Sequence, residues 1–446
     1  MTPVRSDASE SDGLGLRDDL VRWMREPDPA GLEELALRVL RFQAGENPVY
    51  GALVRARGLD PARIDRWENF PPLPARAFRE FPVYCGAPGS EEARFLTSGT
   101  TTRPAAIAEP PAAPTRPPAG AVEGSGTSTA GEAGRGLHRV RDLSIYRTSL
   151  LVQAERYLAH PRPRRVLALL PSPADRPDSS LVHMAGVFHR EWDDGAGGFF
   201  ADSGWTLHRE AFLEALDGAR RDGVPTLLIG TAFAWVHWLE GRGPTGGDRA
   251  SFGGGDRIGL PEGSVLVETG GFKGRSRRVP REELYAALAS RLGIPRRRIV
   301  NEYGMTEMLS QFYEPVLHEM VGTGRGPGGD GVADSEGDTS DPLDARWHEG
   351  PPWVRTRILD PVTLDPVQAG VPGLLCHLDL ANLFSASHIL TEDRGVSVGG
   401  AAGSPEPAGR GAAGRGSAFR LIGRAPGAEP RGCSLVMEEL LEETRG

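Results

Sequence analysis

Short apolar runs and helical patterns alternate through the middle of the chain. The apolar runs cover residues 165–171, 226–230 and 264–268. The helical patterns, in which apolar residues recur every three or four positions, cover 145–158, 210–220 and 281–291. Short buried strands that alternate with helices predict an α/β protein with a largely parallel sheet. Since ligands bind such sheets at the carboxyl ends of the strands, we expect the chemistry in the loops that follow the runs.

The rest of the sequence divides into a helical region and low-complexity segments. Leu20, Trp23 and Met24 follow helical spacing in an N-terminal region at 1–69. Three segments dominated by small and polar residues are predicted to be insertions without a core, at 104–136, 322–337 and 394–417. We therefore expect a core at 70–393 that contains the first two insertions, and a reduced C-terminal segment at 418–446.

Composition and charge favour a cytoplasmic protein. The 446 residues carry a net charge of −9 and the basic residues are mostly dispersed, so the sequence does not indicate nucleic-acid binding. The three cysteines, Cys85, Cys376 and Cys433, are too few for a disulfide framework and fit a reducing compartment. The polar N-terminus is unlike a signal peptide, and no run approaches the length of a membrane span.

A hydroxyl-rich loop follows the apolar residues Phe95 and Leu96. Its candidate phosphate-binding residues are Ser98, Gly99, Thr100 and Thr101. Glycine lets the backbone approach a ligand closely, and backbone N–H groups and hydroxyls donate to phosphate oxygens. The lysine of a P-loop is missing, so a P-loop NTPase is not predicted. The alternative is an ordinary Ser/Thr/Gly turn.

The second motif, Asn-Glu-Tyr-Gly-Met-Thr-Glu at 301–307, places a hydroxyl beside a carboxylate after an aromatic-glycine turn. A carboxylate near a triphosphate usually binds Mg²⁺, which makes Glu307 the candidate metal ligand. The alternative is a helix start with Thr306 and Glu307 on its surface. Together, the two motifs indicate an enzyme that uses ATP to activate another molecule.

Six stretches in order carry a resemblance to a known family. They are FLTSGTT (95–101), LLPSPADRPDSSLVHM (169–184), ETGGFKGR (268–275), NEYGMTEMLSQFY (301–313), LDLANLFS (378–385) and LIGRAPGAEPRGCSL (421–435). On these residues the chain resembles the acyl-protein synthetases, the LuxE-like branch of the adenylate-forming enzymes. The resemblance implies a large adenylate-forming α/β domain with a short C-terminal segment. It also implies ATP and Mg²⁺ as cofactors, a long-chain fatty acid as substrate and an acyl reductase as partner.

The resemblance also implies roles for individual residues. Tyr303 and Gly304 would lie at the adenine, Thr306 at the α-phosphate and Glu307 at Mg²⁺. Gly270 and Gly271 would border the adenine face, Asp379 would bind the ribose hydroxyls, and Arg424 would reach the ribose or phosphate. The resemblance further implies that Cys433 is the thiol that accepts the acyl group. The chain departs from most adenylate-forming enzymes in having no lysine after Arg424, so Lys273 is our own candidate for the cation that assists adenylation.

Alternatives remain at several of these positions. The glycines could serve only a tight turn, Arg424 could be a surface residue, and Cys433 could be a buried, inert thiol. His138 and His183 lie in family-like stretches, but a lone histidine is more often structural than catalytic. No grouping of residues has zinc-ligand spacing. For the whole protein, the alternatives are a ligase that makes acyl-CoA or loads a carrier protein, and a scaffold without catalysis.

Overall fold

The computed structural model describes residues 7–97, 135–159, 161–241, 256–270, 279–317, 342–398, 418–424 and 436–437. Most of the segments expected at 104–136, 322–337 and 394–417 lie outside these ranges, and so do several predicted site residues. Within the described residues, no helix is both long and apolar enough to cross a lipid bilayer.

The larger sheet has six strands in the order β5-β4-β6-β7-β8-β9. Their bounds are β4 Arg165–Ala168, β5 Gly198–Phe199, β6 Thr226–Thr231, β7 Val265–Thr269, β8 Ile299–Tyr303 and β9 Phe312–Tyr313. Strands β5 to β8 run parallel, and β9 closes one edge antiparallel. The three predicted strands are thus confirmed as β4, β6 and β7, and the sheet is largely parallel as predicted.

Helices cover both faces of this sheet. They are α5 Leu143–Leu158, α6 Ser180–Trp192, α7 Arg209–Asp222, α8 Ala232–Glu240 and α9 Arg281–Leu292. Side chains alternate across a strand, so Val166 of β4 packs in the core cluster that holds α5 and α6, whereas Leu167 packs in the cluster that holds α7, α8 and α9. Burial on both faces explains why these strands read as continuous apolar runs. The helices predicted at 145–158, 210–220 and 281–291 are confirmed as α5, α7 and α9.

A second sheet is mainly antiparallel, in the order β1-β12-β11-β10, and β13 pairs with β12. Its strands are β1 Leu73–Pro74, β10 Val354–Leu359, β11 Gly373–Asp379, β12 His388–Ser397 and β13 Phe419–Arg424. A separate pair joins β2 Ala93–Leu96 to β3 Leu137–Val140. Residues 394–397, expected in an insertion, belong to β12, because buried Val396 pairs with β13.

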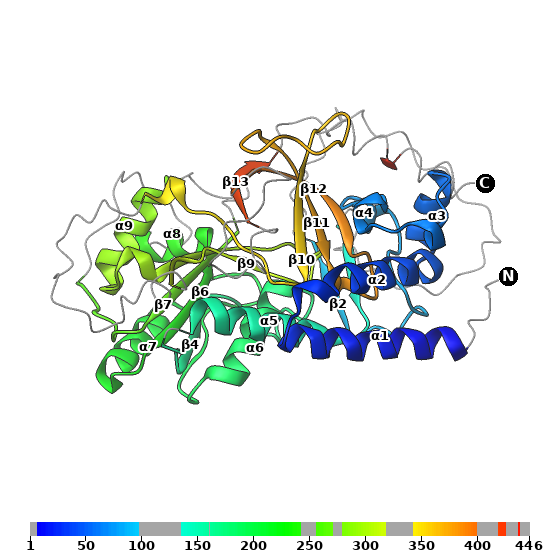
Figure 1. Ribbon diagram of the computed structural model, residues 1–446. Helices are drawn as coiled ribbons and strands as arrows, with labels where there is room; N and C mark the ends of the chain where they lie inside the picture. Colours follow the sequence, from blue (N-terminus) through cyan, green and yellow to red (C-terminus); the bar gives the residue numbers. More distant parts are fainter. Residues whose placement is uncertain are drawn as a thin grey trace, which may run out of the picture.

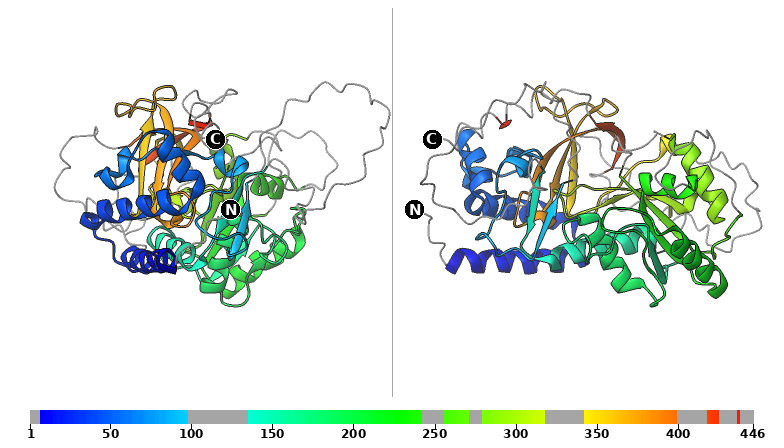
Figure 2. Two further views of the ribbon diagram at one scale, coloured as in Figure 1. Left: turned by 90° about the vertical axis from the view of Figure 1, so that its right-hand side faces the viewer. Right: turned by 180° about the vertical axis from the view of Figure 1, so that it is seen from behind.

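The N-terminal helices are α1 Asp7–Arg25, α2 Leu32–Glu46, α3 Pro48–Ala56 and α4 Ala77–Glu80. Figures 1 and 2 show them at the end of the molecule that holds β10 to β12, away from α7 to α9. An ion pair of 2.6 Å between Arg17 and Asp142 joins α1 to the start of α5. Short 3₁₀ helices cover Pro29–Gly31, Pro61–Arg63, Trp67–Asn69, Arg296–Arg298, Leu343–Ala345 and Leu380–Asn382.

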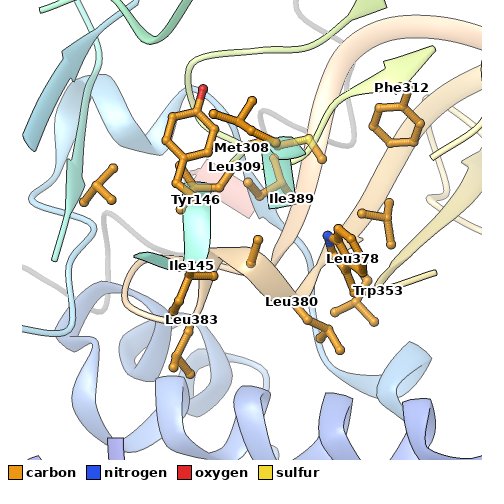
Figure 3. Packing of buried hydrophobic residues seen from close by; sticks show 14 of the residues in the cluster. Ile145, Tyr146, Met308, Leu309, Phe312, Trp353, Leu378, Leu380, Leu383 and Ile389 are labelled. Carbon is orange, nitrogen blue, oxygen red and sulfur yellow. The ribbon is translucent and has the colours of Figure 1, made fainter. Parts of the chain in front are cut away.

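The N-terminal helices share one core with both sheets rather than forming a core of their own. Leu20 of α1 and Leu40 of α2 belong to the same buried cluster as Ile145 of α5 and Leu383. Figure 3 shows the centre of this cluster, with Ile145 of α5 beside Leu383 and with Leu309 beside Met308. Because the cluster reaches the residues after β8 and β11, the helical region and the loops of the candidate site are packed as one unit.

Candidate active site

The carboxyl ends of β7 and β8 meet in a close polar contact. The hydroxyl of Thr269, the last residue of β7, donates to the buried carboxylate of Glu302 in β8. A Cβ atom at Gly304 would clash with Glu302 Oε1, so a side chain there would require the Glu302 carboxylate to move. Gly270, directly after β7, has a φ of +68° with open space around it, which favours glycine for its backbone alone.

Tyr303 ends β8 inside an aromatic cluster. Its ring centroid lies 5.3 Å from that of Phe419 in β13 and 5.7 Å from that of Phe312 in β9. Its hydroxyl donates to Asp393 Oδ2 of β12 at 3.0 Å. Only 7% of Tyr303 is exposed, and burial raises the pKa of its phenol well above the ordinary value. The residue thus joins the parallel sheet to the antiparallel pair of β12 and β13.

Three carboxylates and one arginine surround this junction. Burial raises the pKa of Glu307 to about 7; the charges of Asp393 and Glu392 also raise it, whereas Arg424 opposes them. Arg424 Nε lies 3.6 Å from Asp393 Oδ1. The structure therefore brings together Tyr303, Glu307 and Arg424, which the sequence predicted as site residues. It adds Asp393 and Glu392, which the sequence analysis missed. Their signal in the sequence is an acidic pair inside β12, separated by one threonine from the apolar residues Ile389 and Leu390.

Asp379 lies elsewhere, fully buried at the end of β11. Its Oδ2 accepts from the backbone N–H of Leu309 at 3.1 Å. Its Oδ1 accepts from Ser310 Oγ at 2.7 Å and from the backbone N–H of Ala381 at 3.0 Å. Burial raises its pKa to about 6 against these hydrogen bonds. Since both oxygens already have partners, ribose binding by Asp379 would require an exchange of hydrogen bonds, and this role stays a prediction.

Thr306 sits between α6 and β3. Its Oγ1 lies 3.5 Å from Ser180 Oγ at the start of α6, and its carbonyl oxygen lies 2.7 Å from Nδ1 of His138 in β3. His183, one turn into α6, stacks on Tyr146 with ring centroids 5.3 Å apart. Burial lowers the pKa of both histidines to about 4, so both are neutral at neutral pH.

Seven predicted site residues lie outside the described residues. They are Ser98, Gly99, Thr100, Thr101, Gly271, Lys273 and Cys433. The other two cysteines are buried, as a structural role requires: Cys85 Sγ lies 3.7 Å from the Ser385 carbonyl oxygen and Cys376 Sγ 3.3 Å from His388 Nε2. Among the described side chains, no group of three or more His, Cys, Asp or Glu residues is arranged to hold a metal ion.

The fold is that of the adenylate-forming ligases. The chain is similar to 2-hydroxyisobutyryl-CoA ligase in the postadenylation state with R3-HIB-AMP, at a TM-score of 0.52 and 13% identity over 90% of this chain and 70% of that one. It is also similar to an open conformation of that ligase with 2-HIB-AMP and CoA, at a TM-score of 0.51 and 12% identity over 89% and 71% of the two chains. At sequence identities this low, the structural similarity supports the fold alone. It confirms the predicted fold class.

The family resemblance is confirmed over the C-terminal part of the chain. Residues 339–442 match the family model described as "Acyl-protein synthetase, LuxE". The chain is also 31% identical over 93 residues to the long-chain-fatty-acid–luciferin-component ligase of Aliivibrio fischeri. That match spans 21% of this chain and 22% of the relative.

Proposed function

We propose that this protein is an ATP-dependent acid–thiol ligase that activates a long-chain fatty acid as an acyl-adenylate and transfers the acyl group to Cys433. The observation that carries the proposal is the junction of Tyr303 and Glu307 with Asp393 and Arg424. One side of this junction follows the parallel sheet, and the other lies within the residues that match the acyl-protein synthetase family.

In the first step, a carboxylate oxygen of the fatty acid attacks the α-phosphorus of ATP and pyrophosphate leaves. The Thr306 hydroxyl would donate to the α-phosphate. Magnesium is usually bound by one or two carboxylates together with substrate phosphates, and Glu307, directly after Thr306, would be that carboxylate. The ion would neutralise the negative charge of the phosphates. Gly270, with its open surroundings, would leave room for the adenine together with Gly271.

For the ribose, we propose Asp393 rather than Asp379. A carboxylate that accepts from a diol needs a free lone pair on the site side. The Asp393 side chain is 19% exposed, and its Oδ2 accepts from Tyr303, the first residue of the turn at 303–307, which we call the signature turn. Asp379 is buried and already bonded through both oxygens. Ser98, Gly99, Thr100 and Thr101 would bind the β- and γ-phosphates, and Lys273 would supply a positive charge.

In the second step, the Cys433 thiolate attacks the acyl carbonyl carbon and AMP leaves with the bonding electron pair. The product is an acyl thioester on Cys433. An acyl reductase would then receive the acyl group from it. Arg431, two residues away, would favour the thiolate over the thiol. A thioester keeps the carbonyl electrophilic, which suits transfer to a second protein.

The test is labelling with radioactive long-chain fatty acid and Mg-ATP, followed by a hydroxylamine wash. Wild type is compared with Cys433→Ala and with Cys376→Ala, a matched control at a buried thiol. Hydroxylamine-labile label on wild type and Cys376→Ala, but not on Cys433→Ala, would support the proposal. Acyl-AMP without protein label, with product only after addition of coenzyme A, would replace it by an acyl-CoA ligase. Absence of acyl-AMP across a panel of acids would overturn the adenylation step as well.

A further inference from the structure

His138 connects three parts of the molecule that lie far apart in the sequence. It stands in β3 opposite Phe95 of β2, and 1% of it is exposed. The ring of Phe78 in α4 packs edge-on against its imidazole at 5.3 Å. Its two ring nitrogens contact Thr306 in the signature turn and Ser385 in the segment after β11.

The chemistry of the two partners fixes the tautomer. The Thr306 carbonyl oxygen, 2.7 Å from Nδ1, can only accept, so Nδ1 carries the proton. Nε2, 2.9 Å from Ser385 Oγ, is then the acceptor for the serine hydroxyl. The direction of both hydrogen bonds therefore runs from Ser385 through the imidazole to Thr306.

Ser385 is itself held from the N-terminal helices. Asn47, which caps α3 through the N–H groups of Val49 and Tyr50, donates from Nδ2 to the Ser385 carbonyl oxygen at 2.7 Å. Gln43 of α2 donates to the carbonyl oxygens of Asn382 and Leu383 at 2.8 and 2.9 Å. The residues after β11 are thus fixed by α2 and α3, and they give His138 a rigid support.

The bond to Thr306 falls on the peptide group between Thr306 and Glu307, the two residues proposed to meet phosphate and metal. The next carbonyl, of Glu307, accepts from Asn382 Nδ2 at 2.7 Å. Consecutive carbonyls are therefore tied to the same support. Loss of the bond from His138 would remove the side-chain partner of the Thr306–Glu307 peptide, whose rotation would move the Thr306 hydroxyl and the Glu307 carboxylate.

We infer that His138 is a positioning residue, which orients the Thr306–Glu307 peptide for adenylation through its Nδ1–H. The inference rests on the proposed function, because the nucleotide is what Thr306 and Glu307 would bind. His138 is buried and both of its ring nitrogens have protein partners, so it would act through the backbone of the turn.

Replacement of His138 by asparagine or by glutamine tests the roles of its two ring nitrogens separately. In His138→Asn the amide N–H lies near the position of Nδ1, so the bond to Thr306 is kept. In His138→Gln the amide lies near Nε2, so the contact with Ser385 is kept and that with Thr306 is lost. His388→Gln is the matched control, because His388 is equally buried but contacts Cys376 and Trp67 instead of the signature turn.

The experiment measures acyl-AMP formation as kcat and KM for Mg-ATP in the full chain, with thermal unfolding alongside. We expect His138→Gln to lose up to about 100-fold in kcat/KM for Mg-ATP and His138→Asn to stay within about threefold of wild type. His388→Gln should lower the unfolding temperature without changing KM. Equal losses in both His138 variants that follow their unfolding temperatures would overturn the inference, and so would wild-type kinetics in His138→Gln. Wild type that forms no acyl-AMP would instead overturn the proposed function, on which the inference rests.

Discussion

The hydroxyl of Tyr303 donates a 3.0 Å hydrogen bond to the carboxylate of Asp393, across 90 positions of sequence. The bond joins the end of β8 to β12, and so joins the two sheets where the signature turn begins. Asp393 also faces Arg424 of β13, so the carboxylate stands between a buried phenol and an accessible cation. A carboxylate in this place can accept from a ligand without leaving a buried donor unpaired.

Asp393→Asn should weaken the binding of nucleotide and leave the fold nearly intact. The amide oxygen can still accept from Tyr303, so we expect the free energy of unfolding to change by less than about 1 kcal/mol. The ribose hydroxyls would lose a charged acceptor, which is worth about 1.5–3 kcal/mol, or about ten- to a hundredfold in KM for ATP. Steady-state kinetics of acyl-AMP formation and denaturant unfolding measure the two effects.

Asp379→Ala should show the opposite result to Asp393→Asn: a large loss of stability with little change in KM for ATP. It would leave the buried N–H groups of Leu309 and Ala381 and the hydroxyl of Ser310 without their acceptor. Unsatisfied buried donors cost about 1–3 kcal/mol each, so with three of them we expect a loss of at least about 3 kcal/mol of unfolding free energy. A stable Asp379→Ala protein with a large rise in KM for ATP would instead identify Asp379 as the ribose ligand.

Gly304→Ala should disturb the signature turn through Glu302. The new Cβ would meet Glu302 Oε1 at 2.4 Å and push the carboxylate from the Thr269 hydroxyl, so we expect a loss of kcat for acyl-AMP formation of at least about tenfold. Gly223→Ala is the control: Gly223 ends α7 at a φ of +66° with open space around it. That variant should cost about 1 kcal/mol of stability and no activity. Equal kinetics in the two variants would contradict the prediction.

The parallel core was predictable because its signal is local. Val166 and Leu167 both face apolar neighbours, one on each side of the sheet, so β4 reads as an unbroken apolar run. In the helices between the strands, apolar residues recur every three or four positions. Both features lie within short windows of sequence, and the structure confirms them as β4, β6, β7, α5, α7 and α9.

The polar contacts of the site have no such local signal. The contact between His138 and Thr306 spans 168 positions, and that between Gln43 and Ser387 spans 344. No periodic pattern in the sequence identifies the hydrogen-bond partner of a buried glutamine on α2, because that partner is determined by the packing of the whole core. For the same reason, the sequence could not rank Asp379 against Asp393: the two differ in burial and hydrogen bonding rather than in residue type.

Gln43→Leu should be strongly destabilising. Gln43 Nε2 donates at 2.8–2.9 Å to the carbonyl oxygens of Asn382 and Leu383 and to Ser387 Oγ, and its Oε1 accepts from the Ser387 N–H at 2.9 Å. Leucine fills the space but leaves these groups unpaired, which we expect to cost about 2–5 kcal/mol of unfolding free energy. Denaturant titration of the full chain measures the loss.

Gln153→Leu provides the comparison, since Gln153 is equally buried on α5. Its Nε2 makes only longer contacts, 3.5 Å to the Gln311 carbonyl oxygen and 3.3 Å to that of Glu349, and its Oε1 has no partner within the described part of the chain. We therefore expect Gln153→Leu to cost less than about 1 kcal/mol. A larger loss in Gln153→Leu than in Gln43→Leu would show that the hydrogen bonds of Gln43 do not anchor the residues after β11.

Glu268 of β7 should make the protein less stable as the pH rises from about 4.5 to 7. Burial raises the pKa of its carboxyl to about 7 from the ordinary 4.5, the charge of Glu314 adds to this, and Arg281 opposes it. Below pH 4.5 the group is protonated in both the folded and the unfolded chain. Between those values the unfolded chain ionises first, so the folded state loses stability, and the effect levels off above pH 7.

Glu268→Gln removes this ionisation and keeps an acceptor for the Tyr285 hydroxyl, which lies 3.3 Å from Glu268 Oε2. Relative to wild type, its unfolding free energy should therefore rise by about 3 kcal/mol between pH 4.5 and 8. The control is Glu282→Gln, at a side chain that is 54% exposed; its difference from wild type should stay within about 0.5 kcal/mol throughout. Denaturant unfolding of the three proteins at intervals across this range gives the curves. If the Glu268→Gln difference is flat with pH, the carboxyl ionises as readily in the folded protein as in the unfolded chain, and the buried position of Glu268 does not govern its charge.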